Sequence, residues 1–162
     1  MPVRRWFAPL LGLLSLCATT AAAAQSDEQA AAPATTVTTL YTHHFAHDMA
    51  FTPAGISERS AWLAPDLVAS CRAYFAKPTP PDEVPEINGD PFTDSQEYPT
   101  AFRVGQAELH GDRAVVPVVL SWPGGTTRTV KVGVARIGDA WLVSDVAYES
   151  GPSFRKLLAE GR

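Results

Sequence analysis

Two side chains in this sequence have the types and spacing that acid–base chemistry uses. His44 and Asp48 are four residues apart in an apolar helical pattern, so a helix places them on one inward face. Two interpretations stay open, of which a buried pair satisfying its own hydrogen bonds is favoured over a working site. If the site is open, we expect Tyr41 one turn earlier to line a ligand pocket, with Trp141 and Asp145 facing it from a sheet.

A second group lies in the loop NGDPFTDSQEYP, which spans residues 88–99. It offers oxygen donors that invite calcium, namely Asn88, Asp90, Asp94 and Glu97. The register of a helix-loop-helix calcium site fails, because position six of the loop would be Thr93 instead of glycine and position twelve would be Pro99. We therefore expect no metal here.

A structural role explains this loop better. Phe92 and Tyr98 are expected as apolar anchors, and Asp94 as the cap of a single helical turn over residues 95–97. Gln96, if buried, would hydrogen-bond to the backbone and hold the loop's shape. Together with Asp90, these residues form a motif that we expect to seal one end of the domain.

The remaining residues that could be reactive are histidines and a cysteine. His43 and His47 share a helix face as zinc ligands often do, but His110 lies at a predicted turn and no third ligand is evident. We expect solvated histidines, no metal and no cofactor. Cys71 lies in the apolar helical pattern LVASCRAYF, which favours a buried thiol over a nucleophile.

The first residues predict export. A short basic start precedes an apolar run too short to span a bilayer, and four alanines end at Ala24, so residues 1–24 are predicted to be a signal peptide cleaved after Ala24. A lipoprotein with its lipid on Cys17 is the less favoured alternative, because Leu16 departs from the lipid-attachment pattern. Residues 25–35 are polar and alanine-rich and predict a flexible tether. We expect a periplasmic or secreted protein.

Charge excludes two partner classes. Removing residues 1–24 takes away Arg4 and Arg5 and no acid, so the formal charge changes from −4 to −6. An acidic chain without clustered lysine or arginine predicts binding neither to nucleic acid nor to an anionic membrane surface.

The spacing of apolar residues changes along the chain from a helical pattern to a strand pattern, which predicts the elements that position these residues. Helical spacing from Val37 and an apolar pattern after Pro65 predict helices, and a proline-rich connection follows at residues 77–87. From Thr100, four β-rich runs separated by HGD, PGG and GD predict an antiparallel meander. Pro117 interrupts the second run, so we expect a bulge or an edge there. The run FRKLLAEG predicts a short C-terminal helix.

This order predicts an α+β fold in which N-terminal helices pack on a curved four-stranded antiparallel sheet, within a single domain at residues 36–162. Helices first, then a sheet with Trp141, Val143 and Asp145 in its last strand, resemble the nuclear-transport-factor-like, or cystatin-like, cone. The loop motif DPFTDSQEYP at residues 90–99 and the ending SFRKLL at 153–158 resemble bacterial exported proteins of the domain-of-unknown-function family 3828. The resemblance implies a fold and a compartment and carries over no catalytic residue.

Function is then expected to be binding. The sequence favours an exported, non-catalytic binding or interaction module that acts on an unknown protein or small-molecule ligand, as a monomer or weak dimer. An inhibitor or immunity-type protein that blocks its partner is one such module. The alternative is a small-molecule-binding or acid–base enzyme that uses a pocket with His44 and Asp48.

Overall fold

A computed structural model describes residues 17–78, 82 and 84–161. Residues 1–16 of the predicted signal peptide lie outside the described residues, as do residues 79–81 and 83 of the proline-rich connection. No helix within the described ranges combines the length and the apolar character that crossing a membrane would require.

The first helix is longer than its apolar pattern. α1 spans Cys17–Ala46 and includes the range 25–35, where the sequence predicts a tether. Alanine-rich sequence has high helix propensity, so this part of the chain continues the helix. The predicted cleavage after Ala24 falls within α1 and stays a prediction. The buried face of α1 includes Pro33 and Val37 and continues through Leu40, Tyr41 and His44, at the spacing of a helix packed on one side.

Three shorter helical elements follow, and a fourth ends the chain. α2 spans Pro53–Arg59 and starts at Thr52, whose Oγ1 accepts a hydrogen bond from the amide of Gly55 at 3.1 Å. The 3₁₀ turn η1 (Ser60–Trp62) leads to α3 (Pro65–Ala76), which has a proline in its first turn. α4 spans Phe154–Glu160.

The sheet has five antiparallel strands and confirms the α+β class. They are β1 (Ala101–Val104), β2 (Glu108–His110), β3 (Arg113–Ser121), β4 (Thr127–Ile137) and β5 (Ala140–Ala147). The order is β1-β3-β4-β5, and β2 pairs with β3 beyond the end of β1. The first predicted run is therefore two strands, and the other three runs each form one.

Pro117 explains the divided run, although it lies neither at a bulge nor in an edge strand. It pairs with Lys131 in the regular β3–β4 ladder, and its carbonyl accepts a hydrogen bond from the amide of Gly105 at 2.8 Å. In an antiparallel pair the N and O of one residue point to the same neighbour, so the donor-less nitrogen of Pro117 faces the break between β1 and β2. The ladder breaks where proline cannot donate. The bulge lies elsewhere, at a register shift between β4 and β5 after Gly133.

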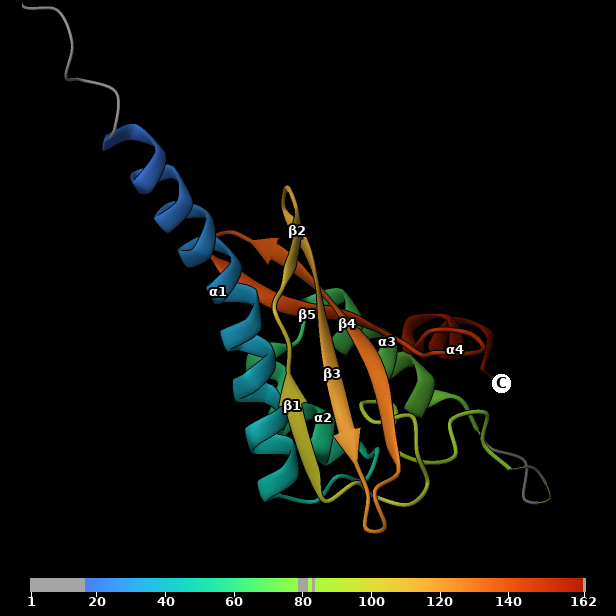
Figure 1. Ribbon diagram of the computed structural model, residues 1–162. Helices are drawn as coiled ribbons and strands as arrows, with labels where there is room; N and C mark the ends of the chain where they lie inside the picture. Colours follow the sequence, from blue (N-terminus) through green and yellow to red (C-terminus); the bar gives the residue numbers. More distant parts are fainter. Residues whose placement is uncertain (1–16, 79–81, 83, 162) are drawn as a thin grey trace, which may run out of the picture.

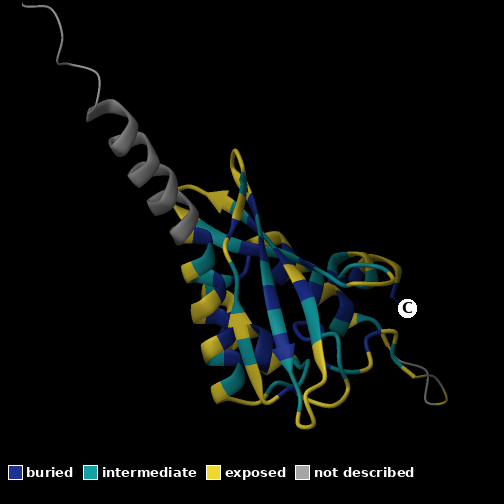
Figure 2. Ribbon diagram, viewed as in Figure 1, coloured by how far each residue is buried: buried dark blue, intermediate teal, exposed yellow. Residues whose placement is uncertain are grey.

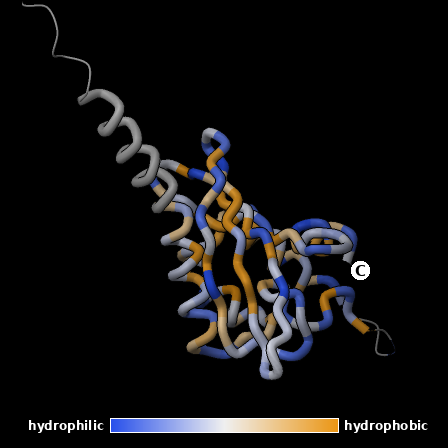
Figure 3. Tube along the Cα trace, in the orientation of Figure 1, coloured by the Kyte–Doolittle hydropathy of each residue, from blue (hydrophilic) through white to orange (hydrophobic). Residues whose placement is uncertain are grey.

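Helices cover one face of the sheet. α2 and α3 lie behind the strands in Figure 1 and α1 runs along their left-hand side, while the face toward the viewer carries no helix from the described ranges. Along β3, buried and half-buried residues alternate (Figure 2), with Ala114, Val116, Val118 and Leu120 turned toward the helices. Apolar colour nevertheless continues along the central strand (Figure 3).

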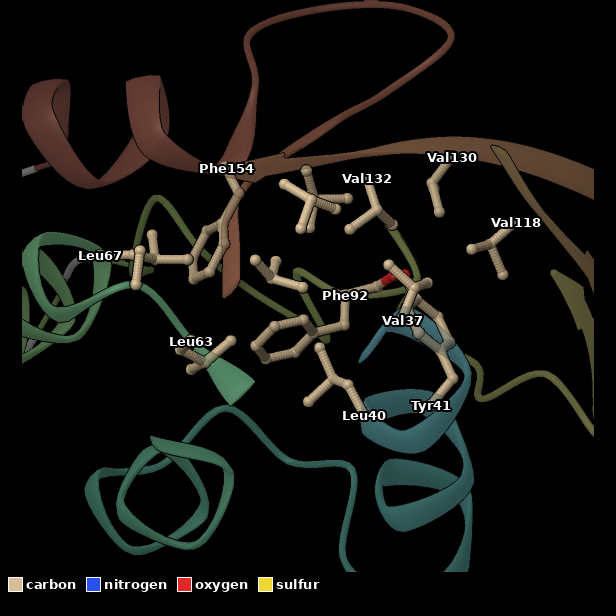
Figure 4. Packing of buried hydrophobic residues seen from close by; sticks show 14 of the residues in the cluster. Val37, Leu40, Tyr41, Leu63, Leu67, Phe92, Val118, Val130, Val132 and Phe154 are labelled. Carbon is tan, nitrogen blue, oxygen red and sulfur yellow. The ribbon is translucent and has the colours of Figure 1, made fainter. Parts of the chain in front are cut away.

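The core fills the space between these helices and the sheet. Phe92, from the loop before the sheet, lies among Leu40 of α1, Leu63 and Phe154 (Figure 4). Its ring is 5.6 Å from that of Phe154 in an edge-to-face arrangement, and only 2% of the residue is exposed. The loop is thus part of the core, as predicted. The cone shape of the resembled fold stays a prediction.

Candidate functional site

His44 points inward, as predicted, but it pairs with a different carboxylate. Its Nε2 lies 2.7 Å from Oδ2 of Asp90, and both side chains are at most 1% exposed. Asp48 is exposed, and its Oδ1 accepts a hydrogen bond from the amide of Ala50 at 2.9 Å. The predicted pairing with Asp48 is wrong because α1 ends at Ala46, so the four-residue helical spacing no longer applies at position 48.

Asp90 organises the loop around this contact. Its Oδ2 also accepts a hydrogen bond from the hydroxyl of Thr93 at 2.6 Å, and its Oδ1 accepts one from the amide of Phe92 at 2.9 Å. The amide of Asp90 donates to the carbonyl of Ser95 at 2.8 Å, which closes the loop on itself. A carboxylate with this many short internal partners is a structural anchor.

Tyr41 provides a second contact between α1 and the loop of residues 88–99. The buried Tyr41 hydroxyl donates to the carbonyl of Phe92 at 2.6 Å. Burial raises the pKa of Tyr41 well above its usual value, and the negative charge of Asp90 raises it further. The phenol therefore stays protonated and serves as a hydrogen-bond donor within the core.

The remaining loop residues divide between inside and outside. Asp94 adopts φ 51°, in the left-handed region, and its Oδ2 lies 3.2 Å from Nη1 of Arg128. It does not cap a helical turn, because residues 95–97 form a bridge and bends. Tyr98 is 43% exposed and is therefore not the predicted apolar anchor, and Gln96 is exposed, so the condition for its predicted role inside the loop is not met. Closure of the loop between Asp90 and Ser95 turns the following residues outward.

The predicted ligand pocket does not assemble. Tyr41 is fully buried, while Trp141 is half-buried and its carbonyl accepts a hydrogen bond from Thr36 at 3.0 Å. Asp145 contacts the first turn of α4, since its Oδ1 accepts a hydrogen bond from the amide of Arg155 at 2.9 Å. The three residues take part in separate contacts: Tyr41 with the loop, Trp141 with Thr36 and Asp145 with Arg155.

The histidine pair on the outer flank of α1 is stacked. The ring centroids of His43 and His47 are 4.1 Å apart, and Nδ1 of His47 lies 2.8 Å from the carbonyl oxygen of His43. Burial lowers the pKa of His43, and the neighbouring His47 lowers it further. Within the described ranges, no three His, Cys, Asp or Glu residues group closely enough to hold a metal ion.

Cys71 is buried, as predicted. It is fully inaccessible to solvent on α3, and burial raises the pKa of its thiol to about 12. A nucleophilic cysteine needs a lowered pKa and access to substrate, and this residue has neither.

Arg59 is a buried charge that the sequence interpretation missed. It is 1% exposed, and its Nη2 donates to the carbonyl of Asp48 just past the end of α1. Burial lowers its pKa, an effect that the nearby Asp90 opposes. Its Cα is one turn from Gly55, where any Cβ would collide with the guanidinium. The glycine in the middle of a short helix was the available signal.

Two surface hollows with polar residues in their walls lie apart from His44. One, of about 750 Å³, lies between the loop and the β3–β4 hairpin; its lining includes Glu86, Asp94, Glu97, Trp122, Arg128 and Tyr148. The other, of about 670 Å³, lies where the start of α3 meets β4, β5 and α4. In the second hollow Arg155 is held by Asp66 at 3.0 Å and by the carbonyl of Ser144. His44 lines neither hollow.

Solved structures with a similar fold come from the type VI effector–immunity complex Tae3–Tai3 of Ralstonia pickettii. A chain of the selenomethionine crystal is matched over 98% of its length and 74% of this chain, with 24% identity and a TM-score of 0.57. A chain of the native crystal is matched over 95% of its length and 75% of this chain, with 24% identity and a TM-score of 0.53. No protein-family model and no curated protein matches this chain. The likeness extends to the fold, and the resemblance to family 3828 stays a prediction.

Proposed function

We propose that this protein is an exported, non-catalytic binding module of the immunity type, which neutralises a harmful protein by forming a complex with it. The observation that carries the proposal is the state of His44 and Asp90. Both groups are buried and bonded to each other, and they hold a loop in place. His44, one of the two residues that the sequence offers for catalysis, thus has a structural contact.

The fold comparison supports the same role. Chains that share this fold come from a complex of an effector with an immunity protein. A protein that carries a harmful activity needs accessible reactive groups, whereas a protein that neutralises it needs only a complementary surface. The buried thiol of Cys71 and the buried pair of His44 and Asp90 fit the second requirement.

Compartment is part of the proposal. The basic start, the apolar run and the alanines before Gln25 support cleavage after Ala24 and release into the periplasm. The acidic mature chain then meets its partner outside the cytoplasm. The enzyme alternative has less support, because Asp48 is exposed and lies apart from the His44–Asp90 pair.

Co-expression tests this function. The products of the reading frames adjacent to this gene are each expressed in the periplasm of a bacterial host, alone and together with residues 1–162, whose own leader directs export. We expect one of them to stop growth alone and to be tolerated in the presence of this protein. The purified pair should co-elute in size-exclusion chromatography with a dissociation constant below about 10⁻⁷ M, within the range of specific complexes.

The controls test the compartment and the role of this protein. A signal-less version kept in the cytoplasm should fail to protect against a periplasmic toxin. Growth arrest by this protein alone would assign it the effector role and refute the proposal. Absence of both protection and complex formation for every adjacent product would refute it as well.

A further inference from the structure

The hollow between the loop and the β3–β4 hairpin has walls that are bonded to each other. Nε1 of Trp122 in the hairpin donates to the carbonyl of Glu97 in the loop at 2.6 Å. Arg128, also on the hairpin side, donates to the carbonyl and the carboxylate of Asp94. The shape of the hollow is therefore set before any partner arrives, which reduces the entropy lost on binding.

The base of the hollow is also fixed by hydrogen bonds. The hydroxyl of Tyr148, at the end of β5, donates to the carbonyl of Pro91 at 3.0 Å. Phe92, the next residue, is anchored in the core, and Asp90 is bonded to α1 through His44. The loop that forms one wall is thus tied to the helix layer, to β5 and to the hairpin.

The charge in this hollow is unbalanced. Arg128 is the one cation among the lining residues, and it is already used by Asp94 and lies 5.7 Å from the centre of the Trp122 ring. Glu86 and Glu97 are exposed on the rim, and among the described residues no cation lies within salt-bridge distance of either. A net negative rim thus surrounds an aromatic wall.

From this geometry we propose that the hollow is the docking site for a loop of the partner protein that carries lysine or arginine. The carboxylates of Glu86 and Glu97 would receive the cationic heads, and the apolar stems would lie along Trp122 and Pro123. Charge complementarity of this kind steers association and selects partners. The inference rests on the proposed function, because it assigns the surface through which that function is exerted.

A peptide titration tests the hollow independently of any partner. The probe is a hexapeptide of alternating arginine and glycine with neutral ends, and the matched peptide has glutamate in place of arginine. We expect the arginine peptide to shift the indole N–H signal of Trp122 and the amide signals of residues 88–97 and 122–128 in ¹⁵N NMR spectra. The glutamate peptide should leave them unchanged, and 0.5 M salt should weaken the response.

Variants locate the effect. Glu86→Gln with Glu97→Gln should weaken peptide binding by at least about fivefold, since exposed ion pairs each contribute a modest free energy. The control, Glu108→Gln with Asp139→Asn, removes the same charge from exposed positions outside the hollow and should bind as the wild type does. Equal weakening by both pairs, or shifts spread over the whole acidic surface, would overturn the proposal.

The partner complex provides the second readout. The Glu86/Glu97 variant should associate with the growth-arresting protein at least about fivefold more slowly than the control variant does. If the complex and its protection persist unchanged in this variant, the hollow is the wrong surface while the immunity function stands. If the peptide response is as expected and no adjacent product binds, the proposed function fails and the hollow keeps its preference for cations.

Discussion

The central prediction concerns which aspartate supports His44. Replacing Asp90 by alanine removes three interactions at once, with Nε2 of His44 at 2.7 Å, the hydroxyl of Thr93 at 2.6 Å and the amide of Phe92 at 2.9 Å. Each buried group left without a partner costs about 1–3 kcal/mol, and local relaxation recovers part of the sum. We expect Asp90→Ala to lower the free energy of unfolding by about 3–5 kcal/mol, the range for breaking a buried pair.

Asp48→Ala is the matched comparison, since the same substitution is made at an exposed site near the same helix. Its exposed carboxylate accepts a hydrogen bond from the amide of Ala50, two residues along the chain. The loss should stay below about 1 kcal/mol, as for a single exposed hydrogen bond. Urea unfolding followed by tryptophan fluorescence measures both values, with equal denaturant slopes as the condition for comparing them.

A double-mutant cycle completes the test. His44→Ala and Asp90→Ala should couple by roughly 2 kcal/mol or more, because the two side chains bond directly in a site without solvent. His44→Ala and Asp48→Ala should be additive. Equal losses at the two aspartates, or coupling of His44 to Asp48, would refute the placement of the loop against α1.

The other predictions test neighbouring features of the fold. Phe92→Ala should cost about 3–5 kcal/mol in urea unfolding, the range for truncating a buried phenylalanine, and an unchanged midpoint would place the loop outside the core. At pH 8 the thiol of Cys71, with its pKa near 12, should react with a disulfide reagent at least ~10³-fold more slowly in the native than in the unfolded protein, because so little thiolate is present; equal rates would contradict its burial. Gly105→Ala should cost about 1–3 kcal/mol in a melting experiment, since its Cβ would lie 2.8 Å from Cγ of Pro117; a wild-type melting temperature would show that β1 and β2 can separate freely from β3.

The sequence predicted the elements better than the contacts. Period and turn residues were sufficient for the helix-then-sheet order, for burial of Cys71 and for the inward direction of His44. These properties depend on local pattern, which a single chain displays directly. The partner of His44 depends on where α1 ends, and the boundary at Ala46 is set by tertiary packing that the local pattern does not contain.

The loop shows the same limit. Phe92 was identified as a core residue because a bulky side chain between turn residues needs a place to be buried. Tyr98 was assigned to the inside by the same reasoning and lies outside, as does Gln96, whose predicted role depended on burial. Their direction follows from the bridge between Asp90 and Ser95, which depends on the buried carboxylate and the left-handed Asp94. Neither the burial of Asp90 nor the backbone conformation of Asp94 produces a repeating sequence pattern that could predict it.

Pro117 has a consequence for how the sheet avoids mispairing. Residues 114–120 read AVVPVVL, so both faces of β3 are apolar, and a shift by one residue would exchange two nearly equivalent sets of side chains. Hydrophobicity alone therefore specifies the register of the central strand weakly. In a shifted pairing the nitrogen of Pro117 would face β4, where the ladder needs a donor, and a hydrogen bond would be lost in the middle of the sheet. Pro117 thus interrupts pairing on the β1–β2 side of β3 and, on the other side, disfavours a shifted register with β4.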